Sequence, residues 1–283
     1  MPQSSYGIAQ PEDLPRLREI FLRCFGAAAA KEADYIFSQK EQIDFWAAKV
    51  QNRPAAMLAA MPVTVVCGGG EYPTRYLYGV ATDPAFRGRG LCSGLLEETC
   101  RHMARQGEAF ALLYPSREQN RRFYAARGFA DCSAVGRGEY AARGGDALPC
   151  TAADAARYDA LRRKFAPEGL QWGREGLSLQ KGWLRLYGGD LWLLLGPPDD
   201  PAGCAAVSRE GEIPRLRELL TAPENIRPAL EGLCRAFDTD RLTLALPQSA
   251  ARRLALPEEP FMMLRRTGDT VWPGPIYTSL AMD

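Results

Sequence analysis

Apolar residues in the first half of the chain follow two periods, one typical of helices and one typical of strands. After a proline and two acidic residues at 11–13, five apolar residues recur at helical spacing and predict a helix: Leu14, Leu17, Ile20, Phe21 and Phe25. The apolar run at 55–67 predicts a buried strand, and three glycines at 68–70 predict a hairpin turn into a second strand that ends near residue 82. The pattern therefore indicates a domain that combines helices with a central sheet.

A change from strand to helix is expected after residue 82. Asp83-Pro84 ends the strand, because proline lacks an N–H and disfavours helical backbone at the residue before it. A basic, glycine-rich turn at 87–90 then leads into an apolar helical stripe that begins at Leu91. Farther on, the apolar run at 109–114 predicts a central buried strand, and a helix is expected at 117–127 with Ser116 as its N-cap.

The basic turn has the composition of an anion site. The first N–H groups of a helix have no partner inside the helix, and their partial positive charge attracts phosphate. Gly88 and Gly90 let the backbone approach a ligand closely, and Arg87 and Arg89 add charge. The turn is neither a GxxxxGK[ST] P-loop nor a GxGxxG dinucleotide fingerprint, because Ser93 stands where the last glycine would be. An ordinary strand-to-helix turn with basic residues is the simpler alternative.

The stretch DPAFRGRGLCSGLL resembles the acyl-CoA signature of the GNAT superfamily of N-acetyltransferases, R/Q-x-x-G-x-G/A, with Arg87, Gly90 and Cys92 at the defined positions. Cys92 departs from the small last residue of that signature. The resemblance implies that residues 87–93 anchor the diphosphate of acetyl-CoA and that strand residues 80–82 pair with its pantetheine arm. The residues expected to bind acetyl-CoA in this stretch are Val80, Ala81, Thr82, Arg87, Gly88, Arg89, Gly90, Leu91, Cys92 and Ser93.

A second motif, NRRFYAARGF, resembles the helix that follows the fifth strand in the same superfamily. The resemblance implies that Asn120 and Tyr124 face the cofactor and that the helix ends at Gly128-Phe129; Ser116 joins the expected cofactor contacts. Tyr124 is expected to lie near the thiol sulfur and to protonate the departing thiolate as the catalytic acid. A packed core tyrosine and a capping or surface asparagine are the alternatives for Tyr124 and Asn120.

The composition changes between residues 131 and 148, where glycine and alanine interrupt the periodic pattern. We therefore expect an acetyltransferase domain at 1–148 and a second domain at 149–283. The second domain has a similar order of elements, with strands expected at 183–186 and 191–195 and an amphipathic helix at 224–237, but no second RxxGxG. A degenerate copy of the first fold that shapes the acceptor cleft is expected, and an unrelated α+β domain is the alternative.

The tandem order is similar to the enhanced-intracellular-survival (Eis) family of acetyltransferases. Members of that family usually carry a third, sterol-carrier-like domain, for which this sequence is too short. A C-terminal carboxylate can act as base in that family, but the role does not transfer simply to Asp283. The fold class expected is thus α/β (α+β), with a mixed central sheet flanked by helices in the GNAT acyl-CoA fold, followed by a second, degenerate GNAT-like domain.

The bulk composition narrows the chemistry. A net charge of +1 disfavours broad binding to nucleic acid or to an anionic membrane, and no apolar run approaches the roughly 18 residues of a membrane span. Eight cysteines without CxxC spacing and a single histidine, His102, argue against disulfides and metal sites and favour a reducing cytoplasm. Acid–base work then falls to Tyr, Asp, Glu, Cys, a chain terminus or water.

The expected function is direct transfer of an acetyl group from acetyl-CoA, as co-substrate, to a primary amine of a small molecule or a protein. In the superfamily that the chain resembles, the segment after the first helix lines the acceptor pocket. The resemblance therefore makes Glu32, Asp34 and Asp44 candidates for holding a cationic amine, against the alternative of a solvated helix face. A catalytically silent acyl-CoA sensor or scaffold and an aminoacyl transferase that uses tRNA are the competing functions. The base, the acceptor and the oligomeric state, a homo-oligomer included, stay open.

Overall fold

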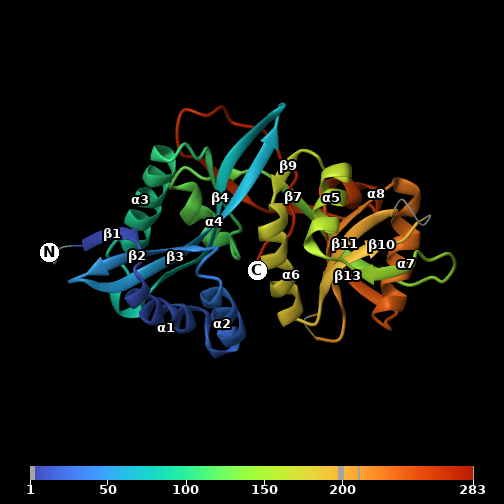
Figure 1. Cartoon of the computed structure of the whole chain (residues 1–283), viewed down its shortest axis with the longest axis horizontal. Coiled ribbons are helices and arrows are strands. Elements are labelled where there is room, and N and C mark those ends of the chain that lie inside the picture. Colours follow the sequence, from blue (N-terminus) through green and yellow to red (C-terminus); the bar gives the residue numbers. More distant parts are fainter. Residues whose placement is uncertain (1–3, 197–200, 210, 283) are drawn as a thin grey trace.

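The computed structural model describes residues 4–196, 201–209 and 211–282 and contains two mixed sheets, each flanked by helices (Figure 1). The first sheet has the order β1-β2-β3-β4-β5-β15-β6, and β9 pairs with β3 beyond the end of β2. Its strands are β1 (Ser4–Ile8), β2 (Asp44–Val50), β3 (Arg53–Cys67), β4 (Gly70–Thr82), β5 (Phe110–Leu113), β6 (Ala130–Asp131), β9 (Gly169–Gln171) and β15 (Met263–Arg266). The helices on this sheet are α1 (Leu14–Phe25), α2 (Ala30–Ser38), α3 (Leu91–Arg105) and α4 (Glu118–Ala125), with short 3₁₀ turns η1 (Pro11–Asp13), η2 (Ala27–Ala29) and η3 (Pro84–Phe86).

Helices cover both faces of the first sheet, which explains why β3 is a nearly continuous apolar run. Side chains alternate between the faces of a strand. Met57 and Ala59 therefore pack in one core with α1 and α2, whereas Leu58 and Ala60 pack in a second core with α3. Within this sheet, β4 and β5 run parallel, and the other strand pairs are antiparallel.

The second sheet has the order β14-β7-β13-β12-β11-β10-β8, again with one parallel pair, β12 and β13. Its strands are β7 (Ala134–Ala141), β8 (Cys150–Ala152), β10 (Asp190–Leu194), β11 (Gly203–Ser208), β12 (Arg215–Thr221), β13 (Arg241–Pro247) and β14 (Glu258–Pro260). The remaining helices are α5 (Ala155–Phe165), α6 (Gly173–Leu186), α7 (Ile226–Ala236) and α8 (Gln248–Arg253), with the 3₁₀ turn η4 (Pro223–Asn225) before α7. The expected α+β fold with two mixed sheets is confirmed.

The two sheets exchange strands. β7 precedes residue 148 but lies in the second sheet, paired with β13, whereas β15 comes from the C-terminal part of the chain and lies in the first sheet between β5 and β6. β9 also joins the first sheet from the second half of the chain. The expected boundary between residues 148 and 149 therefore does not coincide with the division between the sheets, and neither sheet is complete without chain from both sides of it.

The second half repeats part of the first with one segment missing. In the first domain a strand of a parallel pair, β4, leads through η3 and four further residues, 87–90, into α3. In the second, β12 leads through η4 directly into α7. The four residues that have no counterpart are the basic, glycine-rich turn.

One expected strand is a helix. Residues 183–186 were expected to form a strand because they are short and apolar, but they form the last turn of α6. The buried side chains of α6 include Leu177, Gln180 and Leu184, which follow helical spacing over a longer stretch than the apolar run itself. Among the described residues, none of the helices combines the length and the apolar character that crossing a membrane needs, and none of the acidic, cysteine or histidine side chains form a group of three suited to a metal.

Candidate active site

The edge of β4 is open where the site is expected. β4 pairs with β5 over Thr74–Leu77 only, because β5 ends at Leu113, whereas β4 continues to Thr82. On its other side β4 stays paired with β3 up to the Thr82–Ala56 pair. Residues 78–82 thus have no strand on their β5 side, which is the edge where a ligand with amide groups would pair as a strand does.

A bulge interrupts β4 on this open stretch. Ala81 is paired with Met57 and Tyr78 with Ala59, so Gly79 and its neighbour Val80 oppose a single β3 residue. Such a bulge re-aims the backbone locally. Gly79 has a φ of +60°, and a Cβ on it would lie 3.1 Å from a ring carbon of Phe21. The backbone conformation at position 79 therefore favours glycine, and any larger residue would also make a tight contact with the Phe21 ring.

The basic turn ends in a helix N-terminus that faces solvent. Gly88 and Gly90 adopt left-handed backbone with φ of +76° and +73°, and Gly90 is the residue immediately before α3. The first turn of α3 contains no acidic residue, so no side chain on it competes with an anion for the free N–H groups. Arg87 and Arg89 are exposed beside this terminus, as an anion site requires.

Asp83 holds the turn in place. This carboxylate is fully buried and accepts hydrogen bonds from Arg16 and Arg23 of α1, the latter at 2.9 Å, and from the Ala85 N–H at 3.0 Å. Burial by itself would raise the pKa of Asp83, but the Ala85 N–H and the two guanidinium groups outweigh it and lower that pKa below its usual value. The sequence marked Asp83 only as a strand end, since its partners come from a distant helix.

Tyr124 and Cys92 lie close to each other on the face of the first sheet that α3 covers. Both pack with Val80 against the core under α3, and the Tyr124 ring lies 5.7 Å from that of Phe129. Burial, with a smaller contribution from Cys92, raises the pKa of Tyr124 well above its ordinary value. Burial likewise raises the pKa of the Cys92 thiol to about 11. Both groups therefore hold their protons at neutral pH: Tyr124 can donate one, and Cys92 is a poor nucleophile.

Arg127 connects α4 to the first turn of α3, a link that sequence reasoning did not identify. Its guanidinium donates to the Ser93 hydroxyl at 2.9 and 2.6 Å and to the Phe123 carbonyl at 2.6 Å, and it lies over the Phe123 ring. Asn120 donates to the Ser116 hydroxyl at 3.2 Å. The expectation that Ser116 caps the helix is wrong, because α4 begins at residue 118 and the residue before it is Arg117.

A carboxylate and several aromatic rings lie beside β4 at the junction of the two domains. The Tyr187 hydroxyl, after α6, donates to Glu32 of α2, and the Tyr78 hydroxyl lies 3.5 Å from the other Glu32 oxygen. The Trp183 ring stacks edge-on with Tyr78 at 5.5 Å. Tyr78 directly precedes the bulge at Gly79, so Glu32 is held close to the open edge by side chains from both domains.

The two other acidic candidates lie elsewhere. Asp34 is exposed and pairs with Arg18 at 2.6 Å. Asp44 pairs with Arg75 at 2.8 Å and lines a cavity of about 710 Å³ at the far end of β4, which also contains Glu108. The structure therefore brings only Glu32, of the three, to the bulge.

The comparisons with known proteins agree with this geometry. Residues 6–131 match the family model described as an acetyltransferase (GNAT) domain. The resemblance inferred from the basic turn is thus confirmed: the chain carries a GNAT acetyltransferase domain, and its structure as a whole is a tandem, GNAT-like arrangement of two sheets. No curated protein matches the chain.

Solved structures resemble the chain over nearly its full length. A GCN5-related N-acetyltransferase from Anabaena variabilis is 20% identical with a TM-score of 0.73, covering 94% of this chain and 73% of its own. Eis1 from Mycobacterium abscessus is 15% identical with a TM-score of 0.66, covering 94% and 74%. A tandem GNAT protein from the clavulanic acid biosynthesis pathway is 13% identical with a TM-score of 0.56, covering 95% and 100%. At these identities the likeness establishes the fold.

Replacing Asp83 with asparagine should lower the free energy of unfolding at pH 7 by about 3 kcal/mol, because two arginines lose their shared buried carboxylate. The pKa of Asp83 is lower in the folded state, so its contribution is complete above the unfolded pKa and is lost as pH falls through the folded pKa. Urea unfolding between pH 7 and pH 3 should therefore show the wild type and Asp83→Asn converging in acid.

The control for this experiment is Asp131→Asn, which removes an exposed carboxylate paired with Arg121. It should change stability by no more than about 0.5 kcal/mol. A constant gap between wild type and Asp83→Asn at all pH values would contradict the assignment.

Proposed function

We propose that the protein transfers an acetyl group directly from acetyl-CoA to a primary amine. The observation that carries the proposal is the continuity of the open β4 edge, its bulge at Gly79 and the turn that ends at the N-terminus of α3. An edge suited to amides and a terminus suited to phosphate, joined by one short turn, match the pantetheine arm and the diphosphate of CoA.

Each part of the proposed site has a separate role in binding or catalysis. The free N–H groups at 91–93, with Arg87 and Arg89, would bind the diphosphate. The edge from Val80 to Thr82 would align pantetheine, and a backbone N–H beside the bulge would polarise the thioester carbonyl. Ser116 and Asn120 would add contacts from α4 and the segment before it. Holding both reactants against one edge would supply much of the rate.

Tyr124 is the proposed general acid. Its phenol is half-buried beside Cys92, and its raised pKa keeps it protonated until a thiolate departs. The amine first gives up its extra proton to water and then attacks the thioester carbonyl as the neutral form. The C–N bond forms, the C–S bond breaks, and the sulfur takes the Tyr124 proton. The proton that the nitrogen loses on forming the amide returns through water to the Tyr124 oxygen. A covalent route through Cys92 is disfavoured, because its thiol is protonated at neutral pH and sits in the first turn of the phosphate-binding helix.

The acceptor amine is proposed to enter from the Glu32 side. A primary amine is mostly a cation at neutral pH, and a carboxylate flanked by the rings of Tyr78, Tyr187 and Trp183 is suited to hold one. A small molecule and a protein amine both fit this chemistry. The eight cysteines form no disulfide in the described chain, which supports a cytoplasmic location for the reaction.

Reversing both charges in Arg87→Glu/Arg89→Glu should raise the Kd for CoA by about 100-fold or more, because two charge-assisted contacts are replaced by repulsion. Calorimetric titration with CoA measures this effect. The matched control is Arg101→Glu/Arg105→Glu at the opposite end of α3, where both arginines are exposed and pair with Glu98. Equal affinities of the two double variants would remove the proposed diphosphate site.

Tyr124→Phe should lower kcat by about 100-fold or more and leave CoA affinity unchanged, because only proton donation to the thiolate is lost. The readout is release of free thiol over a panel of amines. Tyr72→Phe, which changes a tyrosine at the other end of β4, serves as control and should be fully active. If the wild type binds CoA but acetylates no amine on the panel, the silent acyl-CoA sensor becomes the better account.

Glu32→Gln should raise KM for a cationic amine by about tenfold and leave KM for acetyl-CoA unchanged, because a single charge-assisted contact to the acceptor is lost. Steady-state kinetics with each substrate varied in turn distinguishes the two effects. Asp34→Asn, on the same helix but exposed and paired with Arg18, is the control. An unchanged KM for every amine would place the acceptor elsewhere.

A further inference from the structure

A charged pair is completely buried in the second domain, away from the open edge of β4. Arg162 of α5 and Glu218 of β12 are both 0% exposed, and the Arg162 Nε lies 3.0 and 3.1 Å from the two carboxylate oxygens. A buried ion pair is expensive to desolvate and is a weak source of stability by itself. The segments that the Arg162–Glu218 pair holds together therefore say more about its role than its contribution to stability does.

The partners of this pair come from two parts of the chain. The Tyr158 hydroxyl, on α5, donates to one Glu218 oxygen at 2.6 Å. The Tyr277 hydroxyl donates to the other at 2.6 Å, and the Ser279 hydroxyl donates to it as well. One carboxylate thus joins a helix of the second domain to residues 276–282, which we call the C-terminal tail.

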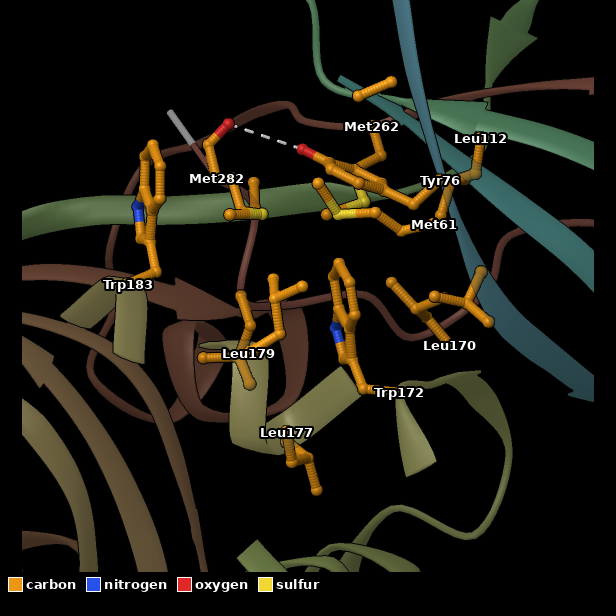
Figure 2. Packing of buried hydrophobic residues seen from close by; sticks show 14 of the residues in the cluster. Met61, Tyr76, Leu112, Leu170, Trp172, Leu177, Leu179, Trp183, Met262 and Met282 are labelled. Carbon is orange, nitrogen blue, oxygen red and sulfur yellow. Dashed lines mark hydrogen bonds between the residues drawn. The ribbon is translucent and has the colours of Figure 1, made fainter. Parts of the chain in front are cut away.

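The C-terminal tail runs from this carboxylate to β4. The Gln180 side chain of α6 donates to the Leu280 carbonyl at 2.8 Å, and the Tyr76 hydroxyl of β4 lies 3.5 Å from the Met282 carbonyl. Figure 2 shows Met282 and Tyr76 joined in this way, and the Trp172 ring stacks edge-on against Tyr76 at 5.2 Å. Residues 278–282 are all buried.

The tail also lies directly on β9. The Leu170 N–H donates to the Tyr277 carbonyl at 2.8 Å, and the Arg162 guanidinium donates to the Leu170 carbonyl at 3.0 Å. Gly169 has a φ of +99°, and a Cβ on it would lie 2.3 Å from the Tyr277 carbonyl oxygen. The backbone of β9 and the tail therefore approach as closely as a glycine permits.

We propose that the Arg162–Glu218 pair is a positioning device for acetyl transfer, which fixes the C-terminal tail against Tyr76 and thereby the acceptor side of β4. Tyr76 is three residues before Gly79, and its neighbour on the same face, Tyr78, contacts both Glu32 and Trp183. A loosened tail removes the packing behind this stretch of β4. The inference rests on the proposed function, because it assigns the network an effect on the same site.

Two tyrosines provide a matched test. Tyr277→Phe and Tyr158→Phe each delete one 2.6 Å hydrogen bond to the same carboxylate, but only Tyr277 belongs to the tail. Tyr277→Phe should lower kcat by about tenfold or more, with KM for acetyl-CoA within about twofold, because misplaced reacting groups slow the chemical step. Tyr158→Phe should keep kcat within about twofold of wild type, since the tail retains its own bonds.

Hydrogen exchange supplies a readout independent of activity. The backbone amide hydrogens of residues 278–282 should exchange with solvent faster in Tyr277→Phe than in Tyr158→Phe. This difference should appear even when the two variants have the same melting temperature. Ser279→Ala, which removes the other tail hydroxyl, should behave like Tyr277→Phe and replaces it if that variant does not fold.

The outcomes separate the two proposals. A wild type that transfers no acetyl group overturns the proposed function and this inference with it. An active wild type with the same kcat in both tyrosine variants, or a loosened tail with unchanged kcat, overturns the inference alone.

Discussion

The site depends on one constraint, the one-sided pairing of β4. A strand that keeps β3 on one edge and loses β5 on the other leaves backbone polar groups without a strand partner between residues 78 and 82. Such groups need a partner wherever water is scarce. An extended ligand with amides would satisfy that need, and the bulge at Gly79 changes the direction of the backbone at this edge. The other parts of the site are arranged around this edge: the α3 terminus at its end, Tyr124 beside it, and Glu32 near its bulge.

The parts of the site that could be predicted from sequence are those determined by local chemistry. Asp83-Pro84 ends a strand, and Gly88 and Gly90 adopt left-handed backbone immediately before a helix, because of properties of those residues alone. Tyr124 is identified in a different way, because the motif NRRFYAARGF resembles the helix after the fifth strand in the GNAT superfamily. The structure brings Tyr124, Cys92 and Val80 to one core, but their roles are still proposals.

The parts that could not be predicted depend on contacts between distant segments. Nothing near Asp83 in the sequence indicates that Arg16 and Arg23 share its carboxylate. Likewise, the apolar run at 183–186 has no local signal that separates a strand from the end of a buried helix. The exchange of β7 and β15 between the sheets is a question of pairing, and hydrophobic periodicity carries no information about which strand is the neighbour.

The exchange of strands also means that the first sheet depends on the second half of the chain, although the second sheet has no phosphate turn. β12 has an irregularity at Arg217, next to Glu218, as β4 has at Gly79, and both strands lead through a proline turn toward a helix. In β4 this position stays open; in β12 the adjacent Glu218 binds the tail instead. The second sheet has no counterpart of the four-residue turn at 87–90, and its corresponding strand holds residues of the C-terminal tail instead. That segment follows β15, which lies beside β5 in the first sheet. Removing the second half of the chain would therefore also remove a strand from the first sheet.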